Sequence, residues 1–481
     1  MPDIRYVCLS DLHFGAENSI LTCLRPNSVE ADPDKPSIVM TAVAECLNTL
    51  VSQNEGDDKP SLILCGDILE LALSTDNIAA MVFSRFIELL FPPSGSQFSK
   101  TIYFVPGNHD HHLWEGARER EYARYLEERP LGEFLEVPWH ASYLFPEQEP
   151  NAFTAEVLAT LVRRYPHLRD AEVRAVYPNL GMIDKGTSHA VVFHHGHFVE
   201  GLYRLMSVLK TMVFPHRSTP ENVWDWESEN FAWIDFFWST LGRSGEVGTD
   251  VGLVYACLQS DKAMKKLAGN LADGISGRLR GPKAVRWAES KAIRFGLEKL
   301  VERIGRLERV EPKDALSSRA RTGLELYLKG PLRNQLLGEC NHTLPDQVTF
   351  IFGHTHKPFE TLLSPDGYGR AVEVYNTGGW VVDTLDPRPL QGGSAILLDE
   401  ELNTVALRFY NQTLDGSVSR VELKVADSTT AGENALYQRL NSLLDTEKQP
   451  WVNLCSAAAQ IVKERHADMA TIVDQVANTM E

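Results

Sequence analysis

The first 110 residues alternate short apolar runs with longer segments of helical periodicity. The apolar runs at 4–9, 61–65 and 101–105 have the length of buried strands, and each stops at a polar cluster. Residues 38–52 and 75–91 repeat apolar side chains at helical spacing, which predicts two helices packed on a sheet. The alternation is typical of an α/β sheet, in which ligands gather at the carboxyl ends of the strands.

The alternation stops after residue 110 and returns later in the chain. Residues 113–170 are charged and are predicted to be mostly helical, with proline-rich joints. Residues 200–345 have a mainly helical pattern and no clear strand. Further strands are predicted at 173–177, 189–193, 347–352, 371–375, 394–398 and 404–410.

This order predicts one α/β domain that is interrupted by a helical insertion. The first part of the core would span 1–199, the insertion 200–345 and the second part of the core 346–425, followed by a helical tail at 426–481. We find no internal repeat and no low-complexity tract.

Composition narrows the function classes. The chain has 481 residues, 43% of them apolar, and a formal net charge of −18, which argues against a general polyanion binder. Seven scattered cysteines without a CxxC pair indicate neither a disulfide framework nor a thiolate zinc site. There is no secretory signal pattern and no apolar stretch of about 18 residues, so we expect a cytoplasmic protein without a transmembrane segment.

Five of the predicted strand ends carry carboxylate, amide or imidazole groups. They are Asp11 with His13, Asp67, the run Asn108, His109 and Asp110, then His195, and finally His354 with His356. So many polar groups in one cleft would be costly without compensation, and a divalent metal compensates them. A mixture of carboxylates and imidazoles suits Mn, Fe, Zn or Ni better than Ca or Mg.

These residues form five ordered blocks with the patterns D-x-H, G-D, G-N-H-D, H-G and G-H-x-H. In this order the chain resembles the calcineurin-like metallophosphoesterases. G-N-H-D and G-H-T-H are the specific signals, whereas D-x-H and G-D alone are common. The resemblance covers about 1–110, 173–199 and 346–425.

The resemblance implies a four-layer αββα fold and a site for two divalent metal ions, most simply Mn. Asp11, His13 and His356 would hold the first metal, Asn108, His195 and His354 the second, and Asp67 would bridge them. His109 would stay free of metal as a general acid or charge stabiliser, and Asp110 would orient its ring.

The fourth block is ambiguous because three histidines crowd together. His195 directly precedes the glycine and is the predicted ligand, whereas His194 is expected to point to the opposite face of its strand. We expect His197, His111 and His112 to line the cleft rather than to bind metal.

The implied reaction is hydrolysis of a phosphate mono- or diester by a hydroxide that the two metals activate. The alternative is a metal-binding scaffold with vestigial catalysis, whose helical insertion binds a partner protein. The second block lacks the arginine of the protein serine/threonine phosphatases. It is similar to G-D-x-x-E of the lipid A pathway pyrophosphatase, but that enzyme has arginine where this chain has His109.

Two stretches of the insertion bear on partners. Residues 224–238 are rich in tryptophan and phenylalanine and are expected to pack as a helix rather than to face lipid. Residues 278–309 carry ten Lys or Arg against four Glu, a local charge of +6, which indicates either a solvated basic face or a wall that attracts an anionic phosphorylated substrate. Stable nucleic-acid binding and peripheral membrane contact are not favoured, and the oligomeric state is left open.

Overall fold

The computed structural model describes most of the chain and leaves one long gap in the predicted insertion. It covers residues 2–149, 153–239 and 313–479, except 187, 205, 208–209, 212–213, 215, 236–238. The basic stretch at 278–309 therefore lies outside the described residues, and the aromatic stretch is described only in part.

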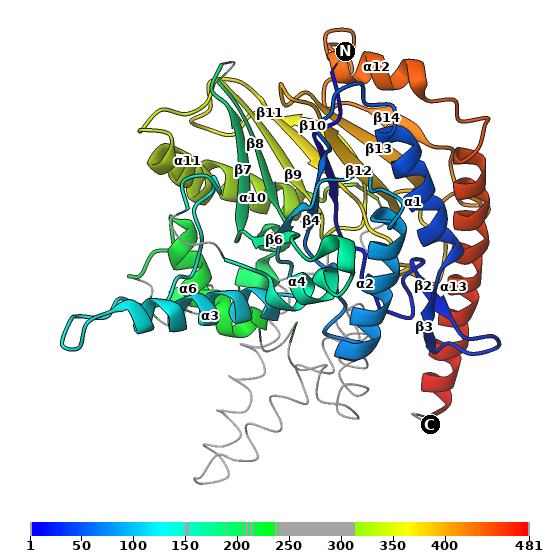
Figure 1. Ribbon diagram of the computed structural model, residues 1–481, viewed down its shortest axis with the longest axis horizontal. Helices are drawn as coiled ribbons and strands as arrows, with labels where there is room; N and C mark the ends of the chain where they lie inside the picture. The colour runs from blue at the N-terminus through cyan, green and yellow to red at the C-terminus, as the bar shows by residue number, and fades with distance from the viewer. Residues whose placement is uncertain are drawn as a thin grey trace, which may run out of the picture.

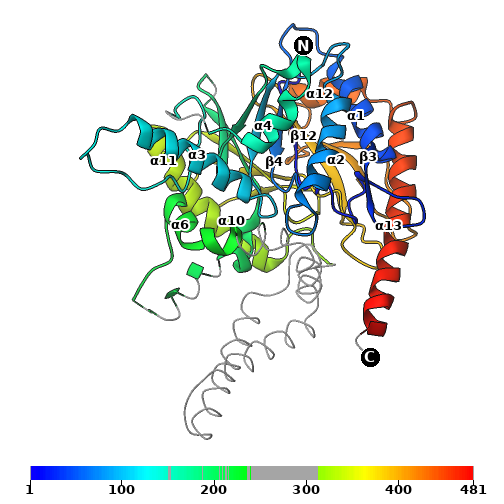
Figure 2. The same cartoon turned by 60° about the horizontal axis from the view of Figure 1, so that its bottom comes forward.

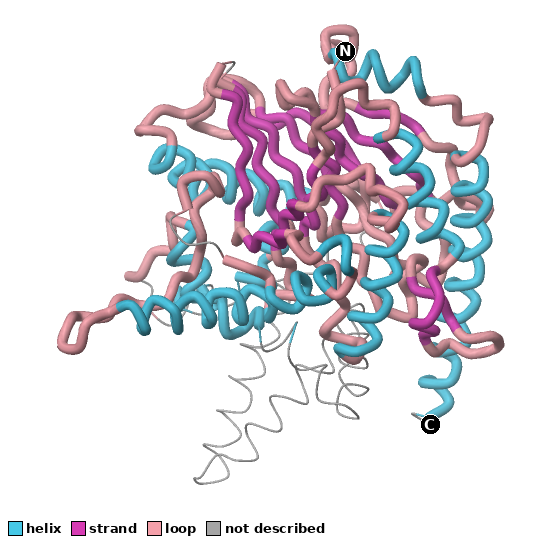
Figure 3. The backbone as a smooth tube through the Cα atoms, in the orientation of Figure 1, coloured by secondary structure: helices cyan, strands magenta, loops and turns pink. Residues whose placement is uncertain are grey.

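Two β-sheets form the centre of the molecule, with helices on both flanks (Figure 3). The seven-stranded sheet has the order β14-β13-β12-β1-β4-β5-β6. Its strands are β1 (Tyr6–Leu9), β4 (Ser61–Cys65), β5 (Thr101–Val105), β6 (Glu172–Ala175), β12 (Gly392–Leu398), β13 (Thr404–Asn411) and β14 (Glu422–Lys424).

The second sheet has five strands in the order β10-β11-β9-β8-β7. They are β7 (Asn179–Asp184), β8 (His189–His194), β9 (Gln347–Phe352), β10 (Phe359–Leu363) and β11 (Val372–Asn376). A separate hairpin is formed by β2 (Thr22–Leu24) and β3 (Ala31–Pro36).

Parallel pairing puts the polar clusters at common edges. Strands β1, β4, β5 and β6 run parallel in one sheet, and β8, β9 and β11 run parallel in the other. The carboxyl ends of parallel strands lie at the same edge of a sheet. Each polar cluster directly follows its strand, so the candidate site residues of each sheet lie along one edge of that sheet.

Helices cover the outer faces of both sheets (Figure 1). On the seven-stranded sheet pack α1 (Ile38–Val51), α2 (Asp76–Leu90), α4 (Glu156–Arg163), α12 (Ala435–Leu443) and α13 (Trp451–Thr479). Three pack on the five-stranded sheet: α6 (Val223–Ile234), α10 (Ser318–Tyr327) and α11 (Arg333–Glu339). Also among the described residues, α3 (His112–Glu128) lies against α4.

A third apolar core lies between the sheets. It joins Ile63 and Val105 of the seven-stranded sheet to Phe193 and Ile351 of the five-stranded sheet, all fully buried. The layers therefore run helix, sheet, sheet, helix, and the predicted α/β fold is confirmed.

The tail adds to the outer helix layer. Helix α13 lies against α1, as both views show (Figures 1 and 2). It buries Leu454 and Val462 in the apolar core between the seven-stranded sheet and its outer helices. Its Arg465 donates a hydrogen bond to the carbonyl oxygen of Thr22 at 2.7 Å. Within the described ranges, no helix is long and apolar enough to cross a membrane.

Two kinds of local expectation were wrong. Helix α3 ends at Glu128 and α4 begins at Glu156, so the described residues between them are not helical. Prolines at 130, 138 and 146 disfavour helical backbone at the preceding residues, which accounts for this loop. Strands β2, β3, β7, β10 and β14 were not predicted either. In β7, four of the six residues are buried, so no alternation of apolar and polar side chains is visible.

Candidate metal centre

The site is built on sharp turns that follow the strands. Asp11, His13, Asp67, His354 and His356 all have positive φ, between 44° and 69°. Such backbone is uncommon for residues other than glycine and is held in place only by surrounding structure. The turns aim all five side chains toward the space between the two sheet edges.

Glycines in two motifs make room for these side chains. A Cβ on Gly66 would lie 2.4 Å from Nδ1 of His195, and one on Gly107 would lie 2.2 Å from Oδ1 of Asp67. Both distances are too short for any real carbon contact, so only glycine fits. The glycine of each motif thus admits a predicted ligand from another part of the chain.

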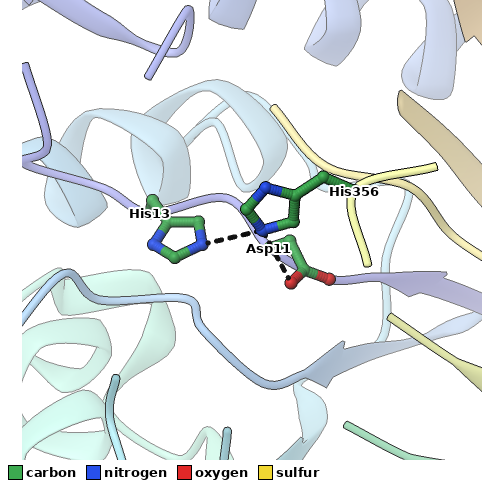
Figure 4. Close-up of side chains that lie close together, drawn as sticks. All are labelled: Asp11, His13 and His356. Atoms are coloured by element: carbon green, nitrogen blue, oxygen red, sulfur yellow. Dashed lines mark hydrogen bonds and ion pairs between the residues drawn. The ribbon is translucent and has the colours of Figure 1, made fainter. Parts of the chain in front are cut away.

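Asp11, His13 and His356 form one buried group (Figure 4). Nε2 of His356 lies 3.3 Å from Oδ1 of Asp11 and 3.4 Å from Nε2 of His13. All three side chains point at one another, and their ligand atoms are close enough to surround one metal ion.

Asp67, His195 and His354 form a second group. Nε2 of His195 lies 3.3 Å from Oδ2 of Asp67 and 3.3 Å from Nδ1 of His354. Oδ1 of Asn108 also approaches Nε2 of His195, at 3.0 Å. All seven predicted ligands are therefore brought together at one edge.

Asp67 lies between the two groups. Its Oδ2 is 3.3 Å from Nε2 of His195 and 3.7 Å from Nε2 of His13. One carboxylate oxygen thus faces the donor atoms of both groups.

The donor set fits divalent cations. Nδ1 of His13 contacts Glu70 at 2.8 Å, and Nδ1 of His356 contacts Asp383. With Nδ1 acting as the donor to a carboxylate, each ring turns a lone pair on Nε2 toward the other. Two facing lone pairs repel each other unless a proton or a metal ion lies between them. The group therefore suits a metal ion, which would take the place of a proton at this position.

The charges lead to the same conclusion. Burial by itself would raise the pKa of Asp67, but the neighbouring imidazoles outweigh burial and hold that pKa well below its ordinary value. Burial opposes protonation of His195 and His356, but the nearby carboxylates raise the pKa of each ring to about 9. Without a cation, these carboxylates hold protons on the imidazoles, and a bound metal would displace them.

His109 is oriented by Glu70 rather than by Asp110. Nδ1 of His109 lies 2.8 Å from Oε1 of Glu70, and its Nε2 lies 4.0 Å from Oδ2 of Asp67. The expectation that Asp110 orients this ring is wrong.

Asp110 instead holds the neighbouring turns together. Its carboxylate accepts backbone N–H groups from Gly107 at 2.7 Å and from Ile68 at 2.7 Å, with longer contacts to Asp67 and Leu69. These turns carry Asp67 and Asn108, so Asp110 positions predicted ligands from two strands.

Sequence reasoning missed three carboxylates that contact the site histidines. Glu70 contacts His13 and His109, Asp383 contacts His356, and Glu200 contacts His354. A signal existed for Glu70, which stands three residues after Asp67 in the second motif. Neither Glu200 nor Asp383 belongs to a motif, so only the fold identifies them.

The structure gives the crowded histidines different surroundings. Nδ1 of His194 accepts the backbone N–H of Gly196 at 2.7 Å, and its ring packs on Tyr327, so it faces away from the predicted ligands. His197 and His111 are fully buried, so they are packing residues rather than an open cleft wall.

His111 has charged neighbours of its own in α6 and at the C-cap of that helix. It lies 3.5 Å from Asp235 and 3.9 Å from Glu227, and His112 lies 3.4 Å from Asp235. Burial opposes protonation of His111, but the two carboxylates raise its pKa to about 9. In the described part of the chain, neither His111 nor His112 is in a group that could hold a metal.

Comparison with known families agrees with this geometry. The sequence model of the calcineurin-like phosphoesterase family matches residues 4–250, about half of the chain. The chain belongs to this family. The matched range ends before His354 and His356, which the G-H-x-H motif predicted and which the fold brings into the site. A search of curated proteins found no match.

Proposed function

We propose that this family member is a phosphoesterase that uses two divalent metal ions. The observation that carries the proposal is the position of Asp67, whose Oδ2 faces the donor atoms of two separate ligand groups. Asp11, His13 and His356 would hold one metal, Asn108, His195 and His354 the other, and Asp67 both.

The metals would supply Lewis acidity, neutralising phosphate oxygens and lowering the pKa of water. The residues of the chain supply orientation and a proton. His109 is held through Nδ1 by Glu70, so Nε2 is the atom that holds a proton or gives it to the leaving group. Asn108 directs its Oδ1 at the second group, and its buried Nδ2 has no hydrogen-bond partner among the described residues.

The substrate is proposed to be an anionic phosphate mono- or diester, with Mn as the preferred metal. The alternative scaffold is less well supported, because all seven predicted ligands and His109 are retained. Residues 200–345 are proposed to set specificity, since their two ends adjoin His195 and His354.

The described part of the aromatic stretch favours packing over lipid contact. Trp226 is buried, and Nε1 of Trp233 donates a hydrogen bond to the carbonyl oxygen of Leu202 at 3.0 Å. We therefore propose no membrane contact for α6.

The test is a panel assay on metal-stripped protein reloaded with Mn²⁺. The substrates are p-nitrophenyl phosphate, its bis-ester and a set of nucleotides, and metal content is measured in parallel. We expect about two metal ions per chain and activity that requires them. Full activity in metal-free protein would overturn the mechanism. Loss of most activity in Asp67→Asn, with a matched Asp399→Asn control far from the site, would support it.

A further inference from the structure

The two ring nitrogens of His354 face different groups. Nδ1 lies 3.3 Å from Nε2 of His195, on the side of the proposed second metal. Nε2 lies 3.3 Å from Oε1 of Glu200. His354 and Glu200 are 6% and 8% exposed, so this carboxylate acts on the ring with little screening by water.

Glu200 is the charged group that faces Nε2 of His354. Nε2 is buried and makes no hydrogen bond of good geometry in the described part of the chain, and the Glu200 carboxylate at 3.3 Å is the acceptor within reach. A buried N–H without an acceptor is costly, so the position of this carboxylate favours the tautomer with the proton on Nε2. A proton on Nε2, facing the carboxylate, leaves the lone pair on Nδ1 directed at His195 and Asp67. A carboxylate that fixes the tautomer in this way also raises the basicity of the ligand.

The predicted insertion holds Glu200 in place. Glu200 follows the short 3-10 turn His197–Val199, and helix α10 packs on this turn. A Cβ on Gly323 of α10 would lie 2.0 Å from the carbonyl oxygen of Val199, so the approach depends on glycine. Tyr203, just beyond Glu200, packs edge-on against His354 with ring centres 4.9 Å apart.

We infer that Glu200 is a positioning residue that sets the affinity of the second metal through His354, and that α10 holds Glu200 in register through Gly323. The inference rests on the proposed two-metal function. It makes metal occupancy depend on the packing of a segment that contributes no ligand of its own.

Asp383 provides a matched comparison within the same centre. It contacts Nδ1 of His356 in the first group, as Glu200 contacts Nε2 of His354 in the second. Removing either charge should therefore lower the affinity for one metal ion and leave the affinity for the other unchanged. Glu373, a partly buried carboxylate that contacts Gln347 and Thr349 on strand β9, is a control outside the centre.

The experiment is calorimetric titration of the metal-stripped full chain with Mn²⁺. We expect Glu200→Gln to weaken one of two binding events by about 10- to 100-fold. Asp383→Asn should weaken the other Mn²⁺ binding event, and Glu373→Gln should leave both binding events unchanged. Activity of Glu200→Gln should recover at high Mn²⁺, which a merely structural lesion would not allow.

A double-variant cycle assigns the affected event to its group. In a His195→Ala background the second metal is already lost, so adding Glu200→Gln should change nothing further, whereas adding Asp383→Asn should still weaken binding. Gly323→Ala should weaken the same event as Glu200→Gln, and Gly330→Ala should not, because its added carbon meets no atom within 4 Å.

The outcomes separate this inference from the proposed function. Wild-type protein that binds fewer than two metal ions would overturn the two-metal function itself. Two ions bound by wild type, with unchanged affinities in folded Glu200→Gln and in Gly323→Ala, would overturn the role of Glu200 alone. If Glu200→Gln does not fold, the comparison of Gly323→Ala with Gly330→Ala decides the question.

Discussion

Glu70 serves two histidines with different proposed roles. Its carboxylate contacts Nδ1 of His13 and Nδ1 of His109, each at 2.8 Å. Burial by itself would raise the pKa of Glu70, but the two imidazoles outweigh burial and lower it, so the carboxylate stays ionised. The proposed proton donor and a proposed metal ligand are therefore held by the same side chain.

His109 should act on the chemical step rather than on metal binding. We expect His109→Ala to keep its metals and its fold but to lower kcat by roughly 10²–10⁴-fold. The loss should shrink for good leaving groups, which need little protonation. Steady-state kinetics on p-nitrophenyl and alkyl phosphates measure this, and equal losses for both would favour charge stabilisation by His109 instead.

Substitutions of the adjacent histidines His194 and His195 should have different effects on metal content and stability. His195→Ala removes a member of the second group and should lose one metal ion and most activity. His194→Ala removes the acceptor for the N–H of Gly196, so it should lower the melting temperature but keep both metals. Metal analysis beside thermal unfolding distinguishes the two variants, and metal loss only in His194→Ala would reverse the assignment.

At the scale of elements, each motif is a strand followed by a tight turn, and Asp110 ties two such turns together. The turns after β4 and β5 carry Asp67 and Asn108, and Asp110 accepts N–H groups from both turns. A change at Asp110 should therefore displace ligands as well as a catalytic group.

Asp110→Ala should lose metal and stability together. Each buried N–H that it leaves without an acceptor costs about 1–3 kcal/mol. We expect a lower free energy of unfolding in urea and weaker Mn²⁺ binding. A variant with normal metal content and stability but low kcat would instead restore the role in orienting His109.

At the scale of the whole molecule, each of the two proposed metal groups takes ligands from both sheets, although a third close cluster, His13, Asp67 and His109, belongs to the seven-stranded sheet alone. Asp11 and His13 follow a strand of the seven-stranded sheet, whereas His356 follows a strand of the five-stranded sheet. Asp67 in turn meets His195 and His354 across the same gap. A bound cation would therefore cross-link the two sheets and stabilise the folded chain.

Stabilisation by Mn²⁺ should grow as the pH rises. His195 and His356 have pKa values of about 9 without metal, so at neutral pH both rings carry protons that the metal must displace. Raising the pH from about 6.5 to about 8.5 removes part of that competition, so the Mn²⁺-induced rise in melting temperature should increase.

The measurement is thermal unfolding at fixed Mn²⁺ and two pH values, with the chelated protein as reference. Proton release on binding is checked by calorimetry in buffers of different ionisation enthalpy. A rise in melting temperature that does not depend on pH would contradict these protonation states.

Much of the core was predictable because its signals are local. The strands at 61–65, 101–105 and 347–352 match the prediction residue for residue, since short buried strands read as apolar runs between polar turns. Strand β7 and the loop after α3 were not predicted, because burial on both faces removes alternation and prolines break a charged pattern that otherwise resembles a helix.

The sequence by itself placed the seven predicted ligands and His109 directly after strands whose ends meet in the fold, and the resemblance of their motifs to the family implied their roles. Only the tertiary structure decided which carboxylates contact the histidines. Glu200 and Asp383 reach His354 and His356 from distant parts of the chain, and Asp110 turns to backbone N–H groups rather than to His109. Such contacts depend on the packing of two sheets and α10, which leaves no periodic trace in the sequence.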